Sequence, residues 1–169
     1  MKKHYDVPSA GALKVVTLSE LMPIICDRLY AGQSVELMPH GVSMLPTIRD
    51  GRDSVILTAV SGRLKKYDVA LYMRESGEYV LHRVIRVGES DYTFIGDSQF
   101  VEEPGITDLQ LLARVAAYKR GSRIMYVDSP RAVLSARLIC LTRPIRRFLK
   151  RVKRRLYRTY SRLKKRIKR

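Results

Sequence analysis

The sequence predicts a mainly β domain that follows a short helix and precedes a long, basic, amphipathic helix. Three observations support this fold class. Short runs of β-branched and aromatic residues, separated by turn residues, fill the stretch 34–128. A helical period of apolar residues comes before that stretch, and a second, strongly basic one comes after it. We therefore expect a helical segment at 1–33, a β domain at 34–128 and a basic helical tail at 129–169.

The first expected helix has a recognisable start. Thr17 and Glu20 have the spacing of a capping box, in which each side chain bonds to the backbone of the other residue. No apolar stretch follows the Met-Lys-Lys start of the chain, so we expect no signal peptide there. Apolar residues continue the helix at steps of three and four and end near Gly32: Leu18, Leu21, Met22, Ile25 and Leu29.

The β domain is expected to hold seven short strands. Glycine-containing turns such as those at Gly51, Gly77, Gly105 and Gly121 separate them. Many short strands at close spacing are typical of a compact barrel or sandwich. The expected strands are Ser34–Leu37, Ser54–Thr58, Val69–Met73, Glu78–Val87, Asp91–Ile95, Arg114–Lys119 and Arg123–Val127.

The basic charge of the chain is concentrated in its tail. The net charge is +17, and residues 131–169 hold 17 of the 33 Lys and Arg and none of the Asp and Glu. One apolar row runs through this segment as one face of a helix that starts after Thr142, the expected cap. The row consists of Leu141, Ile145, Phe148, Val152, Leu156, Tyr160, Leu163 and Ile167.

The tail has three candidate partners. An amphipathic cationic helix gains most at an anionic membrane surface, which the apolar row of 143–169 favours. Binding of RNA or DNA through the cations alone is an alternative, and so is packing of the row on the β domain. No stretch reaches the ~18–20 apolar residues of a membrane span. We therefore expect a cytoplasmic protein, peripheral at the inner face of the cell membrane.

Ser43 lies in a turn-like stretch between two expected strands, where a nucleophile is well placed. Gly41 leaves room for a substrate backbone, and Pro46 prevents the stretch from continuing as a central strand. Backbone N–H groups on such a turn, with Gly41 and Met44 as the candidate residues, are suited to an oxyanion hole. A serine hydroxyl also needs a neighbouring base.

His82 is the candidate base, since it lies in a strand with strong alternation and is rigidly aimed. An imidazole with an ordinary pKa near ~6.5 suits general-base chemistry at neutral pH. Asp97 closes the next strand, where a carboxylate can orient the imidazole. Spacing alone leaves the simpler interpretation open, in which Ser43 is a turn residue and His82 a core residue. The scattered His and Cys residues give no metal-ligand spacing, and no cofactor motif is present.

The stretch Gly41-Val42-Ser43-Met44-Leu45-Pro46-Thr47-Ile48 resembles the nucleophile box of type I signal peptidases, in the family that they share with SOS-repressor autoproteases. Further segments resemble this family in the same order, over about residues 34–118: 50–56, 66–70, 81–85 and 94–98. The resemblance implies a coiled β-barrel. It also implies a serine endopeptidase that cleaves a precursor or leader-type peptide after small residues, with Ser43 as nucleophile.

His82 narrows this resemblance. Most bacterial signal peptidases have Lys at this place, whereas the endoplasmic-reticulum, archaeal and sporulation branch uses a Ser–His pair. The resemblance therefore implies His82 as general base. In that branch an acidic residue shortly after the Gly-Asp-Asn box takes part; Glu103 or Glu102 lies there in this chain, and Asp97 is the other candidate.

The chain departs from the family in three ways. Ser98 replaces the Asn of the Gly-Asp-Asn box, and Gly41 has no hydroxyl to offer an oxyanion. The N-terminal membrane helix of signal peptidases is also missing, which favours a surface-associated enzyme. These departures keep two alternatives open: a binding module with a decayed peptidase fold, and a nucleic-acid-binding protein that acts through its tail.

Overall fold

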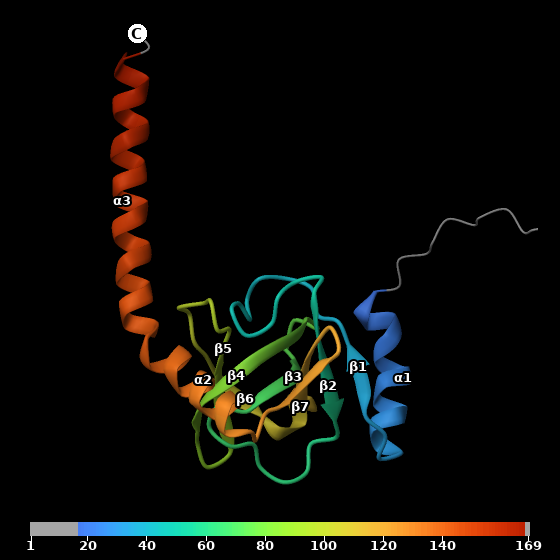
Figure 1. The fold of residues 1–169 in the computed structure, drawn as a ribbon. Coiled ribbons are helices and arrows are strands. Elements are labelled where there is room, and N and C mark those ends of the chain that lie inside the picture. Colours follow the sequence, from blue (N-terminus) through green and yellow to red (C-terminus); the bar gives the residue numbers. More distant parts are fainter. Residues whose placement is uncertain (1–16, 168–169) are drawn as a thin grey trace, which may run out of the picture.

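The computed structural model of this chain describes residues 17–167, and from residue 158 onward it describes the backbone alone. The expectations on residues 1–16, and on the side chains of Tyr160, Leu163 and Ile167, lie outside what is described. One antiparallel sheet forms the body of the molecule. Helix α1 lies at one side of this sheet, and helices α2 and α3 lie at the other (Figure 1).

The sheet has eight strands, which confirms the mainly β class. Its hydrogen-bonded order is β1-β2-β7-β3-β4-β5-β6, and β8 adds to β7. All neighbours are antiparallel. The strands are β1 (Val35–Leu37), β2 (Asp53–Thr58), β3 (Val69–Met73), β4 (Tyr79–Val87), β5 (Asp91–Ile95), β6 (Glu103–Thr107), β7 (Leu111–Arg120) and β8 (Arg123–Tyr126).

Strand β6 was not expected, because Pro104 and Gly105 favour a turn. The structure shows why a strand tolerates them. β6 is the last strand in the sheet order and pairs with β5 alone. A proline on an edge strand interrupts no second ladder, because its missing N–H is not needed on the open side. This edge strand brings Glu103 to the sheet.

The first helix agrees with its prediction. Helix α1 (Leu18–Tyr30) starts at the capping box of Thr17 and Glu20. Three side chains of its inner face are buried in the main hydrophobic cluster: Met22, Ile25 and Leu29. The same cluster includes Met44 and Ile48 from the turn that carries Ser43, together with residues of β2, β3 and β7. The turn is thus anchored in the core of the domain.

The tail forms two helices rather than the single one expected. Helix α2 (Pro130–Leu141) begins at Ser129, whose side chain accepts from the Ala132 N–H, and α3 (Arg143–Ile167) follows it. Thr142 does not cap α3 through its side chain, because its hydroxyl donates to the Leu138 carbonyl at 2.7 Å. Helix α3 extends away from the sheet (Figure 1). Within residues 17–167, none of the helices combines the length and apolarity that a membrane crossing requires.

Candidate active site

The turn that carries Ser43 is fixed by its own backbone and by the core. The Leu45 N–H donates to the Val42 carbonyl at 3.2 Å, and the Ile48 N–H donates to the Met44 carbonyl at 2.9 Å. The side chains of Met44 and Ile48 are buried beneath the turn. Ser43, directly before Met44, stays partly exposed. Local hydrogen bonds and apolar anchors therefore hold the serine at the surface in a defined position.

The loop Gly96-Asp97-Ser98, after β5, braces this turn from the other side. The Ser98 N–H donates to the Ser43 carbonyl at 2.8 Å, and the Ser98 hydroxyl donates to the Val42 carbonyl at 2.8 Å. A Cβ atom on Gly96 would lie 2.8 Å from the Ser43 carbonyl oxygen, closer than atoms tolerate. Glycine and serine are thus suited to these two positions because the backbone of Ser43 packs directly against them.

Asp97 holds the same region together through a buried ion pair. Its carboxylate accepts from Nε and Nη2 of Arg83, both at 2.7 Å, and the two side chains are 0% and 2% exposed. The Thr47 hydroxyl, on the serine turn, also donates to Asp97. Asp97 is therefore engaged by Arg83 and Thr47 rather than by His82. This corrects the expectation that it orients the imidazole.

His82 lies in the middle of β4, paired with Ala70 of β3, and is only 2% exposed. Its Nδ1 atom is 3.3 Å from the Tyr72 hydroxyl and 3.2 Å from Oε1 of Glu103. In the tautomer with its proton on Nδ1, the imidazole donates to this carboxylate, and Nε2 is left as the free acceptor. Of the acidic candidates, Glu103 is the one in contact with the imidazole. Glu102 instead pairs with Arg86 at the surface.

Two residues that the sequence did not single out fix Glu103. The Tyr72 hydroxyl donates to Oε2 at 2.8 Å, and Arg74 donates to Oε2 at 2.9 Å and to Oε1 at 2.6 Å. The period of two along β3 places residues 70, 72 and 74 on one face. The register with β4 makes this the face of His82. The hairpin turn at Gly77 and this alternation are the signals that would have found Tyr72 and Arg74.

The electrostatics leave a neutral imidazole beside a carboxylate. Burial lowers the pKa of His82 below its ordinary value, although the charge of Glu103 acts in the opposite direction. Burial also opposes ionisation of Glu103, but the hydrogen bonds from Arg74 and Tyr72 outweigh it and keep the pKa of Glu103 below its usual range. At neutral pH the pair is therefore a neutral base held by an anion, the arrangement that a serine nucleophile requires.

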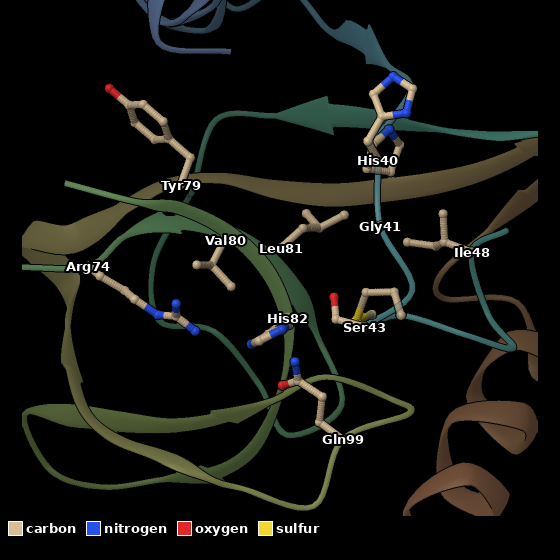
Figure 2. Close-up of a pocket in the computed structure, with 12 residues that line it drawn as sticks. His40, Gly41, Ser43, Ile48, Arg74, Tyr79, Val80, Leu81, His82 and Gln99 are labelled. Atoms are coloured by element: carbon tan, nitrogen blue, oxygen red, sulfur yellow. The ribbon is translucent and has the colours of Figure 1, made fainter. Parts of the chain in front are cut away.

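Ser43 and His82 line one cavity of about 240 Å³ (Figure 2). A larger groove of about 870 Å³ also has Ser43 on its wall. Gln99 borders both spaces, and Phe100 and Lys150 border only the groove. Among the described residues no hydrogen bond joins the Ser43 hydroxyl to His82. Such bonds are often long before a substrate binds.

The backbone around Ser43 also indicates which N–H groups face a substrate. Gly41 has φ of +112°, a conformation that favours glycine, and its N–H donates to Asp50 at 3.2 Å. Its amide is therefore occupied, and its part in the site is to leave space. In the described part of the chain, the N–H groups of Ser43 and Met44 donate to no protein acceptor. They are candidate oxyanion donors beside the serine; the N–H groups of Val42 and Thr47 on the same turn also have no protein acceptor among the described residues.

Metal chemistry has no candidate ligands here, because among the described residues no three His, Cys, Asp or Glu side chains gather as a metal site requires. Comparison of the chain with protein-family models, with curated proteins and with solved structures found no match. The interpretation of the site therefore depends on its own geometry.

Proposed function

We propose that this chain is a serine endopeptidase that cleaves a precursor or leader-type peptide, with Ser43 as nucleophile and His82 as general base. One observation carries the proposal. Nδ1 of His82 faces Glu103 and Tyr72, while the same imidazole shares a cavity with Ser43. A buried histidine that only filled the core would need neither a fixed carboxylate behind it nor an exposed hydroxyl in front of it.

The chemistry follows from these positions. Nε2 of His82 takes the proton of the Ser43 hydroxyl as Oγ bonds to the carbonyl carbon of the scissile peptide. The N–H groups of Ser43 and Met44 donate to the resulting oxyanion. The imidazolium, stabilised by Glu103, then gives its proton to the departing amine, and an acyl-enzyme remains. Water, deprotonated by the same imidazole, releases the second product and restores Ser43.

The cavity beside Ser43 is suited to the side chain that precedes the cleaved bond. Its volume is about 240 Å³, and apolar residues such as Ile48, Val80 and Leu81 contribute to its wall (Figure 2). The resemblance to signal peptidases supports cleavage after small residues. The groove of about 870 Å³, bordered by Val42 and Phe100, is suited to the peptide on the other side of the bond.

The kinship and location of the enzyme are part of the same proposal. The order of the serine, histidine and Gly-Asp segments supports a fold related to the coiled barrel of signal peptidases and repressor autoproteases. The basic tail supports a peripheral position at the inner face of the cell membrane.

A mixed library of peptides tests the activity without knowledge of the natural precursor. Purified wild type is expected to create new peptide termini, detected by mass spectrometry, after a restricted set of small residues. Ser43→Ala and His82→Ala should remove those termini. The proposal fails if wild type creates none, or if both variants cleave as wild type does.

A further inference from the structure

The α2–α3 arm carries a continuous apolar row in solvent. The side chains of this row are between 37% and 70% exposed. They recur at steps of three and four, so the row continues through the joint between the two helices at Thr142. The row consists of Leu134, Leu138, Leu141, Ile145, Phe148, Val152 and Leu156.

The opposite side of the arm attaches to the domain. Ala132, Ala136 and Ile139 of α2 are buried. In the first turn of α3, Arg146 donates to the Asp97 backbone carbonyl at 2.8 Å. The apolar row therefore faces away from the sheet. Packing of this row on the β domain, one of the sequence-based alternatives, does not occur for the side chains that the structure describes.

The charges around the row indicate what covers it. Residues 131–169 contain no Asp or Glu, and Arg147, Arg151, Lys153 and Arg154 of α3 are exposed. An anionic lipid surface satisfies both features, since its headgroups attract the cations and its acyl boundary takes up the apolar side chains. RNA would pair with the cations but leave the apolar row in water.

The arm is also part of the groove beside Ser43. Lys150 of α3 borders that groove, and its Nζ lies 5.2 Å from the centre of the Phe100 ring. The bond from Arg146 to Asp97 ties the same turns to the loop that braces the nucleophile. Lys150 and Arg146 lie on the side of α3 opposite to the apolar row, so a surface that binds the row is separated from the groove by one helix diameter, ~10 Å.

We propose that the α2–α3 arm docks on an anionic lipid bilayer and that docking holds the Ser43 groove close above the bilayer, with the arm between the two. The position of the groove near the bilayer rests on the proposed function, because it identifies the substrate class as peptides presented at a membrane surface. The docking of the arm and the position of the groove are each measured without a substrate. A negative result in either measurement is therefore distinct from failure of the peptidase proposal.

Vesicle flotation tests the docking. The full chain is mixed with vesicles of phosphatidylglycerol and phosphatidylcholine, or of phosphatidylcholine alone. Wild type should float with the anionic vesicles, less at high salt, and little with the neutral ones. The double variant Ile145→Ser, Phe148→Ser keeps the charge and should bind at least about tenfold more weakly. Tyr30→Ser is the matched control, since Tyr30 is 90% exposed on α1 at the other side of the sheet.

Three results would overturn the docking proposal. Wild type remains unbound to anionic vesicles, or the double variant floats as well as Tyr30→Ser, or the chain shifts an RNA in a gel and binds no vesicle. The last result would identify the arm as a nucleic-acid surface instead.

A tryptophan reporter tests the position of the groove, because the natural chain contains no Trp. Phe100→Trp places the reporter at the groove rim, and Tyr30→Trp places it on α1. Vesicles with a dansyl acceptor on their headgroups should quench the emission of Phe100→Trp by energy transfer clearly more than that of Tyr30→Trp. Equal transfer from the two, or none from Phe100→Trp while the protein floats, would show that docking does not hold the groove near the bilayer.

Discussion

Replacement of Asp97 by Asn is predicted to destabilise the domain strongly, whatever its effect on activity. The carboxylate and the Arg83 guanidinium are 0% and 2% exposed and share two hydrogen bonds at 2.7 Å. Asn retains one acceptor but removes the charge, which leaves a buried guanidinium without its counterion. Loss of one partner of a buried ion pair costs about 3–5 kcal/mol. Domains are stable by only about 5–15 kcal/mol, so much of the stability is lost.

Urea unfolding followed by far-ultraviolet circular dichroism measures this change. Glu103→Gln is the matched control, because Glu103 and its partner Arg74 are 20% and 35% exposed and water compensates the lost charge. We expect that control to lose no more than about 1 kcal/mol. Combining Arg83→Met with Asp97→Leu removes both charges and should recover part of the loss. An Asp97→Asn variant within about 1 kcal/mol of wild type would refute the structural role of this pair.

Three further predictions concern the reacting groups and the loop that braces Ser43. Because burial lowers the pKa of His82, kcat/KM should reach half of its maximum at a pH below ~6.5, the ordinary imidazole value. Glu103 raises that pKa, so Glu103→Gln should move the acidic limb of the kcat/KM profile to lower pH and reduce kcat roughly 10²- to 10⁴-fold. An acidic limb that stays at the same pH would contradict the contact between Glu103 and His82. Gly96→Ala places a methyl group against the Ser43 carbonyl and should reduce kcat about 10²-fold. In Gly62→Ala the added Cβ meets no atom within 4 Å but the φ of +69° is strained, so this variant should lose some stability and keep its kcat. Equal kcat in both variants would contradict the bracing role.

The sequence was most informative where local patterns dominate. The capping box of Thr17 starts α1 as predicted, and the alternation along β4 placed His82 in a strand. These features depend on neighbouring residues alone. Mainly β architecture followed for the same reason, since turn residues and short apolar runs are local signals.

Features that depend on distant pairing were not predictable in the same way. Pro104 and Gly105 look like a turn until the sheet order shows that β6 is an edge strand. Without β6, nothing in the sequence decides between Asp97 and Glu103 as the partner of His82. The carboxylate of Asp97 is occupied because Arg83 points toward it within the fold, which a one-dimensional pattern does not reveal.

The tail shows a similar division. The period of apolar residues correctly indicated a helix from Arg143 onward. The tail was expected to be helical from residue 129, but α2 was not distinguished from the long helix because Ala132, Ala136 and Ile139 form a short buried face without a strong polar contrast. The exposed apolar row extends over α2 as well as α3, because α2 turns its opposite, buried face toward the domain.

Labelling of Ser43 by a fluorophosphonate tests the central claim most directly, since it requires an activated serine and no knowledge of the substrate. The wild-type chain should gain one phosphonyl group, located on Ser43 by peptide mass spectrometry. His82→Ala should lose the adduct, and Ser54→Ala, which changes a serine elsewhere in the sheet, should retain it. Equal labelling of Ser43 in wild type and His82→Ala would contradict an assembled Ser–His site. No adduct on the wild-type chain would identify a decayed peptidase fold.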